Sequence, residues 1–363
     1  MPSRKSPLVA LTFAAAVAAT AAPAAADTLL VANKSDATVS LVDLADGEVV
    51  ATLPTGAGPH EIAVSPSGRL AVVADYGGRE PGSTLTVVDV PAAKVLRTIE
   101  LGEYRRPHGL AFVDERRVAV TAEAAKALVV VDVESGEVAR AVPTGQEVSH
   151  MVALGAGGTR AAVANIGSGS VTLVDLASGE KLVDVPTGAG AEGVAMSADG
   201  RWVWVTNREA DTVTLVDFVA REVAATIPSA EFPIRGELTP DGRHLLVTNA
   251  ESGDLTVIDV AERKAVRRVD LALSGSGGEG RLMELGDSSV PIGVEIAPDG
   301  RRAWVAHANA DVVQVLDLES WRPVGVLRAG KEPDGMAYSP LDVAPPAAGE
   351  APHGHGHGHG GTP

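Results

Sequence analysis

The sequence predicts an all-β protein, a seven-bladed β-propeller with four-stranded blades, and two observations lead to that prediction. A strand-like stretch such as residues 171–180 (VTLVDLASGE) recurs seven times, each copy containing an aspartate. The spacings between these aspartates are 46, 43, 43, 42, 42 and 58 residues, and a period near 43 is typical of a four-stranded propeller blade. The shared aspartates are Asp43, Asp89, Asp132, Asp175, Asp217, Asp259 and Asp317.

Each repeat contains four expected strands in a constant order. Residues 202–207 (WVWVTN) typify the first, the shared aspartate ends the second, residues 222–227 (EVAATI) typify the third, and residues 193–197 (GVAMS) typify the fourth. An aspartate carboxylate accepts backbone N–H groups at a bend, and a following glycine supplies positive φ. We therefore interpret the seven aspartates as turn caps and not as a catalytic array.

The two ends of the repeat region predict how the ring closes. The first repeat begins with residues 28–33 (TLLVAN) and has no fourth-type strand before it, whereas the last repeat ends with such a strand at residues 335–339 (GMAYS). The C-terminal strand should therefore join the N-terminal blade, which removes exposed sheet edges. Seven inner strands follow, beginning near residues 61, 109, 151, 193, 236, 293 and 335.

Segments outside the repeats predict three regions. Residues 1–26 combine Arg4 and Lys5 with an apolar run and an Ala-x-Ala site before Asp27, which indicates a secretory signal peptide; a retained N-terminal anchor is the alternative. Residues 27–340 form the propeller, and residues 341–363 form a disordered Pro/Gly/His-rich tail. We expect a periplasmic or secreted monomer with no membrane span after signal removal, because the apolar run is short.

Composition excludes several classes of function. The net charge of −17 argues against nucleic acid as a partner, since phosphate binding requires concentrated Lys and Arg. The absence of cysteine removes thiolate metal sites, cysteine nucleophiles and covalent c-type haem attachment. No phosphate-binding loop or serine nucleophile motif is present. We expect neither haem nor nucleotide, which leaves a small ligand or another exported protein as partner.

The repeats resemble the YVTN family of seven-bladed β-propellers. The resemblance rests on Val-Thr-Asn strands at 205–207 and 247–249, on the TVTLVD strand at 212–217, and on the Asp-Gly-Arg turns, and it covers residues 27–340. It implies a propeller in a secreted or surface protein, and it transfers no catalytic residue because the repeat motif is structural. Related folds include lactonase-like enzymes and the propellers of nitrous oxide reductase and amine dehydrogenases, which is a likeness of fold alone.

The loops on one face vary between repeats, and function usually resides in such loops. The residues at the mouths of the inner strands there would be His60, His108, His150, Glu192, Arg235, Ile292 and Asp334. Ring closure places Asp334 beside His60, so three imidazoles follow one another between carboxylates. Such a set suits a divalent transition metal, Zn²⁺ or Cu²⁺. The three histidines would be primary ligands, Glu192 or Asp334 would complete the site, and Arg235 would hold an anionic ligand. Alternatively, these side chains simply hydrate the channel mouth.

Weaker candidates lie nearby. His307, interpreted as replacing the threonine of a Thr-Asn motif, is a candidate outer ligand. Other candidates on this face, interpreted mainly as turn caps, are Asp75, Tyr76, Glu123, Asn165, Asn207, Asn249 and Asn309. In the insertion at 270–291, Glu279, Arg281, Met283 and Glu284 could form a lid; a mobile glycine loop is the alternative. The tail histidines His353, His355, His357 and His359 could capture Cu²⁺, Ni²⁺ or Zn²⁺, or belong to a plain extension.

Three functions fit these observations. The leading hypothesis is an exported binding protein for a transition metal, or a metal-dependent ligand, at the axial mouth. The second is a non-catalytic scaffold whose variable loops bind another exported protein. The third is a metal-assisted lactonase or hydrolase, in which the metal activates water and Glu192 accepts the proton. The sequence favours binding over catalysis and leaves the choice open.

Overall fold

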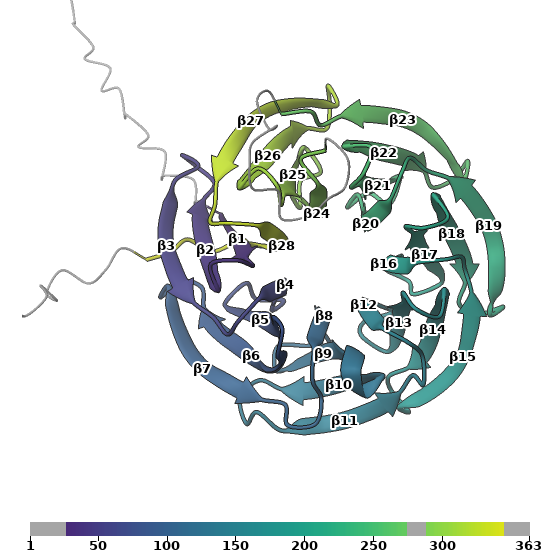
Figure 1. Cartoon of the computed structure of the whole chain (residues 1–363), viewed down its shortest axis with the longest axis horizontal. Coiled ribbons are helices and arrows are strands. Elements are labelled where there is room, and N and C mark those ends of the chain that lie inside the picture. Colours follow the sequence, from purple (N-terminus) through teal and green to yellow (C-terminus); the bar gives the residue numbers. More distant parts are fainter. Residues whose placement is uncertain (1–26, 274–287, 345–363) are drawn as a thin grey trace, which may run out of the picture.

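A computed structural model describes residues 27–273 and 288–344 of the chain, and these residues form a ring of seven four-stranded antiparallel sheets (Figure 1). The predicted fold class is therefore confirmed. We number the sheets as blades 1 to 7 around the ring. Within the described residues no helix is long and apolar enough to cross a membrane, and the one helix there is the short 3-10 helix η1 (Glu123–Ala125).

The first three blades, each written from its innermost to its outermost strand, contain the following elements. Blade 1 consists of β28 (Pro333–Ser339), β1 (Thr28–Asn33), β2 (Thr38–Asp43) and β3 (Val49–Pro54). Blade 2 consists of β4 (Pro59–Val64), β5 (Leu70–Gly77), β6 (Pro81–Asp89) and β7 (Lys94–Glu100). Blade 3 consists of β8 (Pro107–Phe112), β9 (Arg117–Ala122), β10 (Ala127–Asp132) and β11 (Val138–Pro143).

The remaining four blades follow the same order. Blade 4 consists of β12 (Ser149–Gly155), β13 (Arg160–Asn165), β14 (Ser170–Asp175) and β15 (Glu180–Pro186), and blade 5 of β16 (Ala191–Met196), β17 (Trp202–Asn207), β18 (Thr212–Asp217) and β19 (Glu222–Pro228). Blade 6 consists of β20 (Pro233–Leu238), β21 (His244–Asn249), β22 (Asp254–Asp259) and β23 (Lys264–Asp270), and blade 7 of β24 (Pro291–Ile296), β25 (Arg302–His307), β26 (Val312–Asp317) and β27 (Arg322–Arg328).

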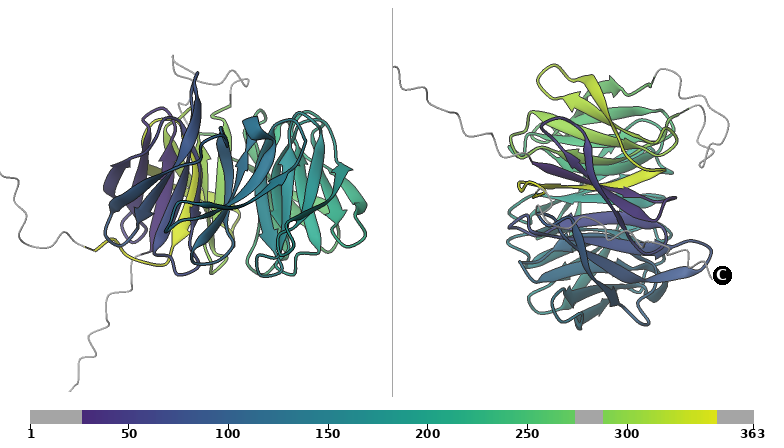
Figure 2. Two further views of the ribbon diagram at one scale, coloured as in Figure 1. Left: turned by 90° about the horizontal axis from the view of Figure 1, so that it is seen from below. Right: turned by 90° about the vertical axis from the view of Figure 1, so that its left-hand side faces the viewer.

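Blade 1 closes the ring as expected, because the C-terminal strand β28 pairs with β1 from the N-terminal end. Leu30 of β1 lies opposite Ala337 of β28. The two views of Figure 2 show the described ends of the chain meeting at this blade. The inner strands begin two or three residues earlier than the sequence indicated, at Pro59, Pro107, Ser149, Ala191, Pro233, Pro291 and Pro333.

The core lies between the blades, because both faces of each sheet are buried. In β10, Val129 packs with residues of blade 2, whereas its neighbour Leu128 packs with residues of blade 4. Both side chains have no exposed surface. Burial of one Val or Leu side chain contributes about 1.5–3 kcal/mol. Because these side chains pack between neighbouring blades, each blade is stabilised by the two blades beside it.

The seven repeated aspartates cap turns, as predicted. In every blade an Oδ1 atom accepts at least one backbone N–H from two or three residues ahead, for example Asp43 from Ala45 (2.7 Å) and Asp317 from Ser320 (2.7 Å). The other five make the same contact. These carboxylates lie at the opposite ends of their strands from the variable loops, so they position the frame and not the candidate site.

Candidate functional site

All seven inner strands begin with the same backbone conformation. The residue immediately before each inner strand has positive φ: Gly58, Arg106, Val148, Gly190, Phe232, Val290 and Glu332. This conformation is strained for a β-branched residue, yet Val148 and Val290 adopt it with φ of 56° and 57°. A bulge follows two residues into each strand, where the register shifts.

The strand register around this bulge shows that Arg235 does not occupy the mouth position that the sequence predicted. In blade 5, Ala191 lies opposite Asn207 and Val194 opposite Val205, while in blade 6 Pro233 lies opposite Asn249 and Gly236 opposite Val247. The residue equivalent to Glu192 is therefore Ile234, and Arg235 lies one residue deeper in the channel. The mouth of the ring contains five polar residues and two isoleucines, Ile234 and Ile292.

In three blades a threonine near the end of the second strand, Thr121, Thr206 or Thr248, ties the mouth residue of the next blade to its own blade. Thr121 accepts a hydrogen bond from the Gly109 N–H (2.8 Å) and donates one to the carbonyl of His150 in the next blade (2.5 Å). Thr206 makes the same pair of contacts to Gly193 and Ile234. Glycine is required at position 109, since a Cβ there would lie 2.7 Å from the His150 carbonyl oxygen.

Three of the polar residues near the mouth approach one another closely enough to hold a metal ion. One ligand atom from each of His108, Glu123 and His150 lies within 4.8 Å of the other two, and all three residues are buried. The rings of His108 and His150 lie against each other with centroids 3.6 Å apart and planes tilted by 32°. His108 Nδ1 is buried and has no hydrogen-bond partner. Imidazole and carboxylate together form a donor set for Zn²⁺ or Cu²⁺.

Two histidines of the arc are neutral near neutral pH. Burial holds the pKa of His108 well below its usual range, and the charges of His150 and His60 act in the same direction. Burial also lowers the pKa of His60 to about 4, although Asp334 opposes the shift. His60 Nδ1 lies 2.8 Å from the Gly58 carbonyl oxygen, which selects the tautomer protonated at Nδ1. A neutral imidazole has a free lone pair, so both rings have the protonation state that a metal ligand requires.

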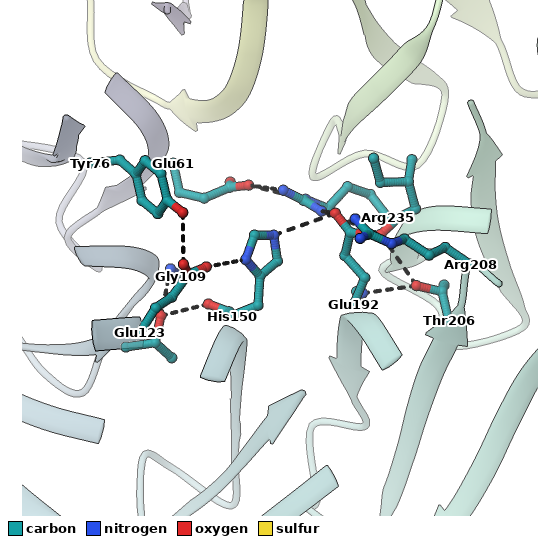
Figure 3. A network of polar contacts seen from close by, with 12 residues as sticks. Glu61, Tyr76, Gly109, Glu123, His150, Glu192, Thr206, Arg208 and Arg235 are labelled. Atoms are coloured by element: carbon teal, nitrogen blue, oxygen red, sulfur yellow. Dashed lines mark hydrogen bonds and ion pairs between the residues drawn. The ribbon is translucent and has the colours of Figure 1, made fainter. Parts of the chain in front are cut away.

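His150 differs because it lies between two carboxylates (Figure 3). Its Nδ1 lies 2.5 Å from Glu123 Oε1 and its Nε2 lies 3.4 Å from Glu192 Oε1. Burial opposes a charge on this ring, but the hydrogen bond with Glu123 and the negative charge of Glu192 outweigh burial and raise the pKa of His150. A metal ion at His150 would therefore take the place of a proton.

Glu192 belongs to an ion-pair network that crosses the channel (Figure 3). Arg208 donates to Glu192 Oε2 (2.7 Å), and Arg235 lies 3.3 Å from Glu192 Oε1. Burial opposes ionisation, yet the hydrogen bond and charge of His150 together with the two arginines lower the pKa of Glu192 to about 2. Arg235 also donates from Nε and Nη2 to Glu61 Oε1 (3.0 and 2.9 Å). The Arg235 residue is only 7% exposed, and its guanidinium is occupied by carboxylates of this chain.

The structure places the remaining candidates as follows. Asp334 is 3% exposed, and its Oδ1 has no hydrogen-bond partner; with His60 it continues the arc but lies outside the 4.8 Å group. His307 lies opposite Pro291, as Asn249 lies opposite Pro233, so it replaces the asparagine of the motif and not the threonine. It is fully buried, with Nδ1 2.7 Å from Ser289 Oγ. The lid residues 279–284 and the four tail histidines lie outside the described residues.

Three residues of this site have contacts that their sequence context does not indicate. Glu123, a turn-cap candidate by its sequence, faces His150 in the structure. Glu61 and Arg208 belong to no repeated motif. Glu61 directly follows His60, and a bulge that turns both residues toward the channel has no sequence signal of its own. The contact between Glu61 and Arg235 joins residues 174 positions apart, which no local pattern reveals.

A second pair of carboxylates lies on the inner strands of blades 6 and 7. Glu295 Oε1 accepts the Tyr338 N–H (3.1 Å), and Glu237 accepts the Ile296 N–H in the same manner. Burial raises the pKa of Glu295 to about 8 and raises that of Glu237 well above its ordinary value. Each side chain therefore satisfies an N–H group of the neighbouring inner strand as a neutral acid.

The fold and the polar cluster together define the class of the protein, a seven-bladed β-propeller with a buried His/Glu group at its axial mouth. The chain belongs to the YNCE-like beta-propeller family, whose model matches residues 3–118 and 121–280. The predicted membership of a YVTN-type propeller group is thereby confirmed. No curated protein matches the chain.

Solved structures show the same fold at low identity. A functionally unknown protein from Desulfotomaculum acetoxidans DSM 771 is 12% identical, with a TM-score of 0.71 over 87% of this chain and 100% of its own. The dihydro-heme d1 dehydrogenase NirN, in complex with DHE, is 16% identical, with a TM-score of 0.60 over 85% of this chain and 74% of its own. At these identities the likeness shows the fold alone.

Proposed function

We propose that this protein is an exported binding protein that holds a divalent transition metal, Zn²⁺ or Cu²⁺, at the axial mouth. The observation that carries the proposal is the meeting of His108, Glu123 and His150 within 4.8 Å, from two adjacent blades, in a buried setting. The residues fit such an ion because two imidazoles and one carboxylate are recurrent ligands of protein-bound zinc. Export is supported by the signal-like residues 1–26, and the site needs no cysteine.

The proposal refines the ligand set expected from sequence. Glu123 replaces Glu192 as the carboxylate ligand, since both oxygens of Glu192 already face arginines. His60 and Asp334 are the candidates for completing the coordination, because His60 keeps Nε2 as an acceptor and Asp334 Oδ1 lacks a partner. Arg235 is engaged by Glu61 and Glu192, so an anionic co-ligand would meet Arg208, whose side chain is 29% exposed.

The hydrolytic alternative loses support from the state of Glu192. A general base works best with a pKa near the working pH, whereas the pKa of Glu192 is lowered to about 2 by His150 and the arginines against the effect of burial. The alternative of a non-catalytic scaffold, whose variable loops bind another exported protein, needs no ligand in the channel, and a different observation agrees with that. Arg235, Glu61, Glu192 and His150 already neutralise one another, so the network could serve as a plug that rigidifies the ring without any ligand.

Metal content distinguishes these functions. The full-length chain, with His353, His355, His357 and His359 replaced by serine, is incubated with Zn²⁺ or Cu²⁺, freed of unbound metal by gel filtration and analysed by mass spectrometry. We expect about one ion per chain, as for a site of this donor set, and its loss in His108→Ala and Glu123→Gln. His244→Ala is the matched control, since it removes an imidazole that lies against Trp321 and should retain the metal. A folded chain without bound metal would reject the proposal in favour of the scaffold.

A further inference from the structure

Tyr76 connects blade 2 to the candidate metal group. It lies near the end of β5, and its hydroxyl donates a 2.7 Å hydrogen bond to Oε2 of Glu123 in blade 3 (Figure 3). Its ring lies 4.3 Å from the His60 ring and meets the edge of His108 at 5.5 Å. The Arg106 guanidinium lies 4.7 Å above the Tyr76 ring. Contacts on several sides therefore restrict the position of the hydroxyl.

The two oxygens of Glu123 have different partners. Oε1 lies 2.5 Å from His150 Nδ1, while Oε2 accepts from Tyr76. The backbone of Glu123 is also held, because its N–H donates to the Arg106 carbonyl (3.1 Å) at the start of η1. A metal ion that replaces the proton between Glu123 and His150 would bind Oε1. Oε2 would remain hydrogen-bonded to Tyr76, which leaves Glu123 as a ligand through one oxygen.

We infer that Tyr76 is a positioning residue that sets the metal preference of this site, by holding Glu123 as a one-oxygen ligand beside two imidazoles. This inference rests on the proposed metal-binding function. A compact set of two nitrogens and one oxygen suits Zn²⁺ and Cu²⁺, whereas Mn²⁺ and Ca²⁺ prefer more oxygen ligands. Carboxylates that bind through both oxygens are common for the larger ions. Loss of the Tyr76 hydroxyl would free Oε2 and relax the selection.

The test compares the affinities of two ions in matched variants. Zn²⁺ and Mn²⁺ dissociation constants are measured by competition with a chelating dye, using the full-length chain with the four tail histidines replaced by serine. The variants are Tyr76→Phe, which removes only the hydroxyl, and Tyr104→Phe, which makes the same change in a residue packed against the core of blades 2 and 3. The Cu²⁺ electron paramagnetic resonance spectrum reports the ligand field independently of stability.

Partners of metal ligands typically change affinity 10- to 100-fold, so we expect Tyr76→Phe to weaken Zn²⁺ by about that factor, to change Mn²⁺ by less than about 3-fold, and to shift the Cu²⁺ spectrum. Tyr104→Phe should change none of these. An unchanged ratio of the Zn²⁺ and Mn²⁺ affinities, whether both weaken equally or neither weakens, would overturn the inference. If His108→Ala abolishes binding while Tyr76→Phe leaves the ratio intact, the metal function holds and only the role of Tyr76 fails. If His108→Ala retains the metal, both fail.

Discussion

Arg235 is the residue whose loss should destabilise the ring most clearly among the charged groups of the channel. Substitution of Arg235 by methionine keeps an unbranched apolar side chain but removes the guanidinium between Glu61 and Glu192. Glu61 loses both of its hydrogen bonds from Arg235, and Glu192 loses one of its cationic neighbours. Breaking a buried ion pair from one side costs about 3–5 kcal/mol, because the remaining carboxylate stays buried without its partner.

The pKa of Glu192 gives a free energy of similar size. Its pKa lies at about 2 instead of 4.5, although burial opposes this, and such a shift corresponds to roughly 3 kcal/mol supplied jointly by His150, Arg235 and Arg208. For a cooperative ring of roughly 300 residues, 1 kcal/mol changes the melting temperature by about 1.5 °C. Arg235→Met should therefore lower the melting temperature at pH 7 by about 5–8 °C.

Differential scanning calorimetry with a matched variant provides the assay. Arg208→Met removes another arginine from Glu192, but the Arg208 side chain is 29% exposed, so its loss should cost less than about 1 kcal/mol. Because the folded pKa of Glu192 lies below the unfolded one, its contribution is complete above pH 4.5 and is lost as pH falls toward 2. The effect of Arg235→Met should shrink over that range. Equal effects of the two substitutions at pH 7 would refute the proposed role of the buried network.

Two further predictions concern the inner strands. Burial raises the pKa of Glu295 to about 8, above its unfolded value. The folded protein therefore binds more protons than the unfolded chain and loses stability as pH rises from about 4.5 to 8. The melting temperature of Glu295→Gln should match that of the parent at pH 4 and exceed it at pH 9, and identical pH profiles would contradict this. Thr206→Val removes the link from Gly193 to Ile234 and should cost about 1–3 kcal/mol, because the Gly193 N–H stays buried. A change in unfolding free energy below about 0.5 kcal/mol, measured by urea titration, would show that this link contributes little to stability.

Much of the fold was predictable because the repeat is local and redundant. Seven copies of one pattern establish blade number, strand order and turn chemistry, and an error in one copy is corrected by the others. The aspartate turn caps and the closure by β28 were predicted for this reason. The starts of the inner strands were less accurate, since a positive-φ residue such as Val148 before the strand leaves no reliable trace in residue type.

The candidate site was predictable only in part. The sequence placed His60, His108 and His150 on neighbouring blades, and the structure brings the last two rings into contact. It assigned the carboxylate role to Glu192 or Asp334, because these residues occupy the equivalent positions in the blades on either side of the three histidines. Arg208 approaches Glu192 from the turn after β17, and Arg235 approaches it from β20. This pairing removes Glu192 from the set of free ligands.

The sequence by itself determined the propeller, the direction of ring closure, the structural role of the repeated aspartates and the row of histidines. These features follow from periodicity, which the chain carries in residue order. Only the tertiary structure decided which side chains meet in the channel. Seven inner strands converge there, so contacts such as Glu61 to Arg235 and Tyr76 to Glu123 cross from blade to blade. The bulge at each strand entrance sets which side chains face the channel. The prolines that begin β4, β8, β20, β24 and β28 align Ile234, and not Arg235, with the other mouth residues, whereas the partners of Arg235 follow only from the tertiary structure.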